Sequence, residues 1–260
     1  MSKFLDRLER ISLGAPVPMG FGMPRTKKTP GMALVGLVSG DYTAGMGALA
    51  KLVPDAALIS GSNGLPTLKK LGRSFGEEIP WGLRVSSLTE EEARTYQGEG
   101  SDLVAFSLEG TPVSAVAPDG MARILCIEAG MPIEQIRALD ALPIDVVLLS
   151  MTGVSAPWTL ANLATIAGVG QRVDKYLLVE VPELPVAKDL EAIREVGVQG
   201  LVADVSAVAP ESLAGLKAAL LDMPRKRPPA KGRAAAILPN SVFFPEPVAG
   251  HEEEPPEEDE

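Results

Sequence analysis

Eight short apolar runs recur along the chain, and most are followed by a polar or glycine-containing junction and then by a helical pattern. Strands buried on both faces of a parallel sheet have this continuous apolar character. The runs cover residues 33–38, 56–59, 81–85, 103–106, 123–127, 145–149, 176–179 and 200–203. Their alternation with helices predicts an α/β chain that folds as a single closed (β/α)8 barrel of the TIM type.

Helical patterns fall between most of the apolar runs. They lie near residues 44–53, 65–76, 89–97, 132–141, 158–168, 186–196 and 210–222. Thr89 to Glu92 has the sequence of a capping box, which marks the start of the third of these helices. After the fourth run, residues 109–116 leave room for only a short or irregular helix.

The length of the chain, 260 residues, allows one barrel and little more. We expect an N-terminal helix and a Gly/Pro-rich strap over residues 1–33, the barrel over 34–223, and a linker and tail over 224–260. Residues 2–12 form an amphipathic helix with Phe4, Leu5 and Leu8 on one side. Its polar side is not basic enough for a lipid surface, so we expect it to dock on the bottom of the barrel. Residues 14–31 form either a lid or a fixed strap.

The C-terminal segment combines a basic, Pro-rich linker with an acidic tail. Seven acidic residues stand among the last nine, so the net charge of −10 becomes −3 without them. We expect this tail to be disordered, and the segment to be the place where a protein partner or a second copy would bind. The composition predicts no nucleic-acid or membrane partner. Without a long apolar stretch or a signal sequence, we expect the protein to be cytoplasmic.

The C-terminal ends of the predicted strands are rich in acidic residues. With alternate residues facing inward, the last inward positions are Ser107, Glu109, Glu128, Ser150, Glu180 and Asp204, with Asp41, Asn63 and Arg84 near the ends of the first three strands. Converging carboxylates repel one another unless they bind a cation, share protons or pair with Arg84. This pattern predicts a Mg²⁺ or Mn²⁺ site with Glu128, Glu180, Asp204 and Glu109 as ligands. Alternatively, the acids cap the following helices or face solvent.

Arg84 is the basic residue at a strand end. It either holds a substrate carboxylate or phosphate, with Asn63 and Ser150 as further substrate-binding residues, or balances the acids. The single cysteine, Cys126, lies in a predicted core strand, where we expect it to serve packing.

Several chemistries are disfavoured by the residues that are missing. His251, in the tail, is the only histidine, which excludes a Ser-His triad or a His-ligated metal in the barrel. No lysine ends a strand, which disfavours a Schiff-base aldolase. The turns after the last two strands carry acids where phosphate-binding barrels have glycines. We therefore expect no FMN, NAD or haem.

Part of the chain resembles a known family. Residues 124–130, 133–139 and 144–149 resemble a stretch of the metal-dependent hydroxy-acid aldolases, the citrate-lyase-β-like family. Residues 81–85 resemble the family's substrate-binding arginine strand. The resemblance implies that Glu128 is a metal ligand and that Arg84 binds the substrate carboxylate. Where the family has a second acidic ligand, this chain has Ser150 to Gly153.

Two functions remain open. In the first, the barrel is a divalent-metal-assisted lyase that acts on a small carboxylate, with Glu128 and Arg84 as catalytic residues and the ion stabilising an enolate. In the second, the barrel has lost catalysis and serves as a binding or scaffold subunit that uses its C-terminal segment.

Overall fold

The computed structural model describes residues 2–13, 28–39, 42–61, 75, 78–117 and 119–224. The chain divides into two units, residues 1–226 and 227–260, and the second unit lies outside the described residues. Most of the predicted strap and nearly all of the predicted linker and tail also lie outside them, so the predicted domain boundaries stay predictions. No helix within the described part of the chain combines the length and apolar character needed to cross a membrane.

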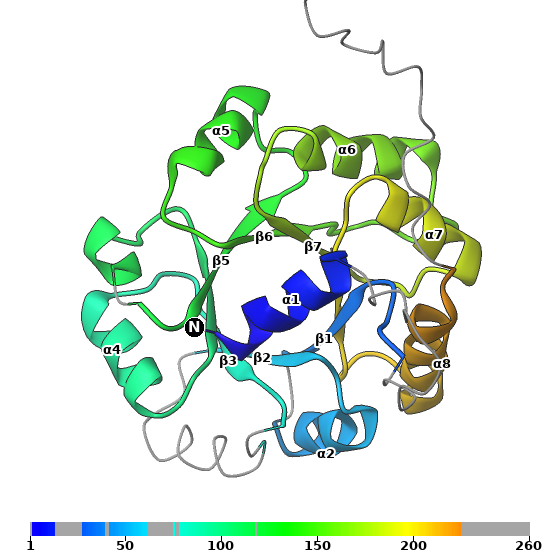
Figure 1. Ribbon diagram of the computed structural model, residues 1–260, viewed down its shortest axis with the longest axis horizontal. Coiled ribbons are helices and arrows are strands. Elements are labelled where there is room, and N and C mark those ends of the chain that lie inside the picture. The colour runs from blue at the N-terminus through cyan, green and yellow to red at the C-terminus, as the bar shows by residue number, and fades with distance from the viewer. Residues whose placement is uncertain are drawn as a thin grey trace, which may run out of the picture. The chain divides into compact units, whose positions relative to one another are not determined.

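Eight parallel strands close into a barrel in sequence order, with the last strand paired to the first (Figure 1). They span Ala33–Val38 (β1), Ala56–Ser60 (β2), Trp81–Arg84 (β3), Leu103–Ser107 (β4), Ala122–Glu128 (β5), Val146–Ser150 (β6), Tyr176–Val181 (β7) and Gly200–Asp204 (β8). Every predicted run begins and ends within about two residues of a strand, which confirms the predicted (β/α)8 barrel.

Helices surround the barrel (Figure 1). They are α2 (Tyr42–Leu52), α4 (Glu90–Gly98), α5 (Ile133–Ala138), α6 (Leu160–Gly170), α7 (Ala187–Glu195) and α8 (Pro210–Asp222), with short 3₁₀ helices η1 (Val113–Val116) and η2 (Leu139–Ala141). The capping box is present, because Thr89 and Glu92 each accept a bond from the other's backbone N–H. The irregular helix expected after the fourth strand is η1. The helix predicted over 65–76 lies outside the described residues, Phe75 apart.

Small residues line the interior of the barrel near the starts of the strands. Paired residues on neighbouring parallel strands point to the same side, and the registers place Ala33, Ala56, Gly82, Ala122 and Gly200 inside. A Cβ atom on Gly82 would lie 1.7 Å from the backbone oxygen of Leu103. The strands therefore approach closely here, and the remaining space must be filled from below.

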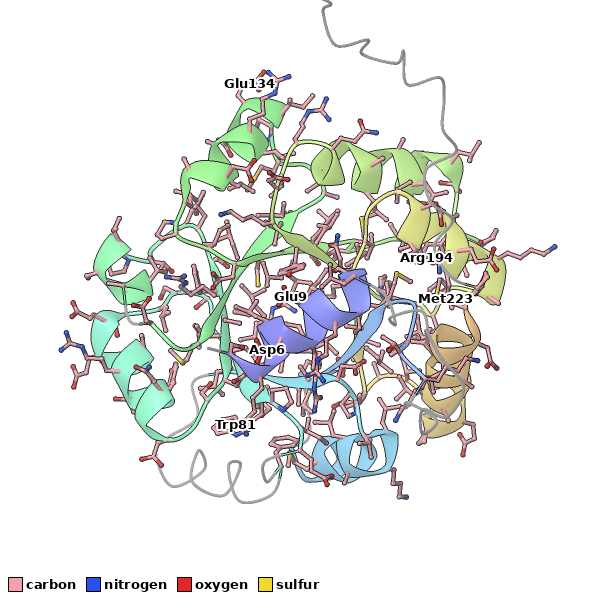
Figure 2. All side chains as sticks on the ribbon, in the orientation of Figure 1. Asp6, Glu9, Trp81, Glu134, Arg194 and Met223 are labelled. Atoms are coloured by element: carbon pink, nitrogen blue, oxygen red, sulfur yellow. The ribbon has the colours of Figure 1, made fainter. Side chains whose placement is uncertain are left out.

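Helix α1 (Lys3–Leu13) fills that space. Figure 1 shows it lying across the end of the barrel. Phe4 and Leu8 are fully buried and pack against the interior side chains of the strands, whereas Asp6 and Glu9 lie on the side turned away from the barrel (Figure 2). The predicted docking of an N-terminal amphipathic helix on the bottom of the barrel is confirmed.

Polar contacts fix both the start and the middle of α1. The Ser2 hydroxyl donates to Asp102 (2.8 Å), and the backbone N–H groups of Lys3 and Phe4 donate to the same carboxylate (both 2.9 Å). One turn later, the Arg7 guanidinium donates to the backbone oxygens of residues 55 and 78. The first N–H groups of a helix have no partner within the helix, and Asp102 satisfies two of them.

The segment that enters β1 packs against the segment that leaves α8. The backbone N–H of Gly31 donates to the Leu220 oxygen (2.8 Å), and a Cβ atom on Gly31 would lie 2.8 Å from the Cβ of Met223. Arg194, which lies beside Met223 in Figure 2, is buried and donates to the backbone oxygen of Pro224. These contacts hold the two ends of the barrel sequence together where β8 meets β1.

Candidate functional site

The strands carry polar side chains at the end of the barrel opposite α1. On neighbouring strands, Ser60 pairs with Arg84, and Ser107 pairs with Cys126. Ser150 pairs with Glu128 on one side and with Glu180 on the other. We call these inward positions, together with Asp204 at the end of β8, the mouth. It combines three hydroxyls, a thiol, one guanidinium and three carboxylates, whereas the layers below it are apolar. The mouth is therefore the candidate site.

Arg84 and Glu180 form an ion pair across the mouth. Arg84 ends β3 and Glu180 lies near the end of β7, four strands away in a ring of eight, so the two residues start from opposite sides of the barrel. Arg84 Nη1 lies 2.7 Å from Glu180 Oε1, and the side chains are 25% and 21% exposed. Pairing of a carboxylate with Arg84 was one of the three arrangements that the sequence left open, and it holds for Glu180.

The surroundings of Arg84 keep it charged. Burial lowers the pKa of the guanidinium, but the hydrogen bond from Arg84 to Glu180 and the nearby Cys126 outweigh burial, and the pKa of Arg84 is raised above its ordinary value. Glu180 bonds through one oxygen only. The other, Oε2, is buried and has no hydrogen-bond partner among the described residues.

Cys126 lies beside the ion pair. It faces the interior from β5, midway in strand order between β3 and β7, and is partly buried. Burial raises the pKa of its thiol to about 11, an effect that Arg84 opposes and Glu180 reinforces. The thiol is therefore neutral at ordinary pH. The packing role expected from the sequence does not include this contact with Arg84. The sequence held a signal for it, because Cys126 lies two residues before Glu128 on the same strand and so faces the same side.

Asp204 makes local contacts. Its side chain accepts a hydrogen bond from the Ser39 hydroxyl and another from the backbone N–H of Ser206 (2.8 Å). Both oxygens are thereby used in holding the end of β1 to the turn after β8. Asp204 does not cap the following helix, because α8 begins at Pro210 and has no side-chain cap, so the alternative in which the acids cap the following helices does not describe this residue.

The remaining predicted residues are dispersed. Glu128 is exposed at the end of β5, and Glu109 is exposed two residues beyond β4. The Ser150 hydroxyl bonds to that of Thr152 (2.9 Å). Asn63 and Asp41 lie outside the described residues. Of the predicted site residues, the structure thus brings Arg84 and Glu180 into contact.

The predicted metal site is not assembled in the described residues. No group of three or more His, Cys, Asp or Glu side chains stands there in an arrangement that could hold a metal ion. The donor set at the mouth does not fit a Mg²⁺ or Mn²⁺ ion held by Glu128, Glu180, Asp204 and Glu109, because Glu180 binds Arg84 and Asp204 binds its own turn.

Comparison with known proteins identifies the fold. No protein-family model matches the chain, and no curated protein matches it. A solved structure from Aquifex aeolicus VF5 is similar with a TM-score of 0.59 at 14% identity, covering 86% of this chain and 100% of that one. Two mutants of the tryptophan synthase alpha-subunit from Pyrococcus furiosus have TM-scores of 0.59 and 0.57 at 12% and 11% identity, covering 74% of this chain and 98% of theirs.

These similarities concern the architecture. At such identities a common fold is no guide to a common reaction, because barrels of this kind carry many unrelated activities. No match supports the citrate-lyase-β-like family in particular. The chain has the TIM-barrel fold.

Proposed function

We propose that the mouth binds a small carboxylate and that Arg84 holds its carboxyl group. The observation that carries this proposal is the single-oxygen contact between Glu180 and Arg84. A guanidinium presents five N–H donors in a planar fork, so a pair made through one oxygen leaves donors for a second acceptor. Arg84 is charged, three-quarters buried and placed at the barrel end where ligands of this fold bind.

The neighbouring groups suit a polar ligand. Ser107 and Ser150 offer hydroxyls from strands that flank Cys126 and Glu180, and the Cys126 thiol is neutral. A lyase reaction on the bound carboxylate, with Glu128 as a catalytic residue, is part of the same proposal. The described residues do not assemble a three-ligand metal site, so in this proposal Arg84 holds the carboxyl group.

A second candidate, a barrel that binds its ligand or partner without catalysis, is favoured by the contacts of the acids. Glu180 is paired with Arg84 and Asp204 with its own turn, so neither stands free as a general base. Turnover of a bound acid would exclude this candidate.

Thermal-shift titrations of the full-length protein test the proposal. Pyruvate, lactate, malonate and citrate serve as ligands, each with and without Mg²⁺ or Mn²⁺. A ligand at about a hundred times its Kd stabilises the folded protein by about 2.7 kcal/mol. We expect the melting temperature to rise with ligand concentration until it saturates. The bound ligand should also slow the alkylation of Cys126, the only cysteine of the chain.

Matched variants assign the shift. Arg84→Lys keeps the charge but loses the fork, and it should weaken binding at least tenfold. Arg123→Lys is the control, because Arg123 also pairs with a carboxylate, both oxygens of Asp145 (3.0 and 3.1 Å), but does so near the start of β5, away from the mouth. The proposal fails if Arg84→Lys binds like the wild type. A shift that needs the metal ion and is lost in Glu128→Gln would instead support the metal-assisted lyase.

A further inference from the structure

Exposed apolar side chains collect at one end of the barrel. Among the described residues, seven large apolar side chains are exposed, and five of them lie on the segments that follow β4 to β7. We call these five the apolar rim: Leu108, Val113, Ile133, Leu160 and Val186. The other two, Leu13 at the end of α1 and Val53 after α2, lie at the opposite end.

Two members of the apolar rim stand on segments that are bonded to each other. Leu160 is the first residue of α6 and is 84% exposed, and Val186 immediately precedes α7 and is 63% exposed. The loops leading to the two helices are joined by a hydrogen bond from the backbone N–H of Ala156 to Glu183 Oε2 (2.8 Å). Leu160 and Val186 therefore stand on helices whose leading loops are joined. Large exposed apolar patches on a folded protein mark interaction sites.

The charges around the apolar rim have one predominant sign. In the described loops and first helical turns after β4 to β7, the exposed charged side chains are Lys188 and four acids, Glu109, Glu128, Glu134 and Glu183, and Arg137 is exposed one turn beyond Ile133 on α5. Glu134 projects from the outer edge of α5 in Figure 2. The surface is therefore both apolar and acidic.

We propose that the apolar rim binds a segment of a partner protein in which Lys or Arg side chains accompany apolar ones. Apolar side chains of the segment would cover Leu160 and Val186, and its cations would face Glu134 and Glu183. Symmetric association of two copies through this face would bring acids against acids, which is unfavourable. An anionic membrane surface would be repelled for the same reason. The proposal does not depend on carboxylate binding by Arg84.

Binding of two labelled peptides to the full-length protein tests whether the apolar rim prefers a segment with basic side chains. One has 14 residues, with Leu and Lys spaced to form an amphipathic helix, and the other has Glu in place of each Lys. We expect the Lys peptide to bind, and its affinity to fall at least tenfold in Leu160→Ser/Val186→Ser. Leu13→Ser, which changes a side chain of similar exposure at the opposite end, should bind normally. Glu134→Gln/Glu183→Gln should reduce the dependence of binding on salt.

Four results would overturn the proposal. The first two are unchanged affinity in Leu160→Ser/Val186→Ser and equal binding of the Glu peptide. In the third, sedimentation shows self-association that Leu160→Ser/Val186→Ser abolishes, which would make a second copy the occupant. In the fourth, peptide affinity rises when the Lys and Arg residues between 225 and 233 are changed to Gln, which would assign the surface to the chain's own basic segment.

Discussion

Asp102, the residue before β4, caps helix α1, which begins 99 residues earlier in the chain, at Lys3. Its two carboxylate oxygens accept bonds from the Ser2 hydroxyl and from the backbone N–H groups of Lys3 and Phe4. The helix cap is thus supplied by the barrel itself. Docking of α1 and the position of β4 are therefore coupled.

Replacing this cap should loosen α1. Asp102→Ala removes the acceptor of two helix N–H groups, and loss of a cap costs about 1–2 kcal/mol of the free energy of unfolding. Urea unfolding measures the loss, and hydrogen exchange should show faster exchange of the α1 amides. Asp102→Asn keeps one acceptor oxygen, so its free energy of unfolding should lie between those of Asp102→Ala and the wild type. Unchanged protection of α1 in Asp102→Ala would contradict the coupling.

A methyl group at Gly82 should disrupt the barrel. The Cβ atom of Gly82→Ala would lie 1.7 Å from the backbone oxygen of Leu103, so β3 and β4 would have to separate. Overpacking of this kind costs about 1–3 kcal/mol or more. Gly215→Ala in α8 is the control, since nothing lies within 4 Å of its Cβ position and alanine favours a helix. We expect thermal melting to show a large loss for the first variant and a small gain for the second.

Cys126 should react slowly with iodoacetamide at pH 8 and faster as pH approaches its pKa of about 11. Burial is the main cause of the raised pKa. An unfolded cysteine has a pKa of about 8.5, so above that pH the unfolded chain releases its proton first. The contribution of Cys126 to stability is full below about 8.5 and is lost as pH rises through the pKa of the folded state. Cys126→Ala should flatten this alkaline decline. Fast alkylation at pH 7 would contradict the burial of the thiol.

Asp55 should make stability fall as pH rises from the acid range. Burial raises its pKa, and the bond from the Leu34 N–H (2.9 Å) and the charge of Arg7 offset burial only in part. The proton is held more tightly in the folded state, so the contribution of Asp55 is full below its unfolded pKa of about 3.9 and is lost above the folded pKa. Asp55→Asn retains an acceptor for Leu34. Its free energy of unfolding, measured by urea titration from pH 3 to 7, should depend less on pH than that of the wild type.

The barrel could be predicted because its strands are buried on both faces, so nearly every residue of each strand is apolar. The residues of the mouth were harder to place. Alternation predicts Ser150, Glu180 and Asp204 correctly as inward. It does not extend to Glu109, because β4 ends at Ser107 and Gly110 turns the chain with a positive φ of 78°. Parity holds only while the backbone stays extended.

The partners of the inward residues were less predictable than their positions. Sequence spacing places Arg84 and Glu180 on separate strands, but the contact between them depends on the barrel diameter and on the length of the arginine side chain. The local bonds of Asp204 and the position of Cys126 beside Arg84 depend on the same geometry. Residue type suggested a metal site, whereas the distances favour an ion pair.

Helix α1 also contacts nearly all the strands of the barrel at once. Its seat is made by side chains from β1, β2 and β4 to β8, and its cap by Asp102, so the seat is complete only when these strands are together. A probe attached to α1 would report the closure of the barrel.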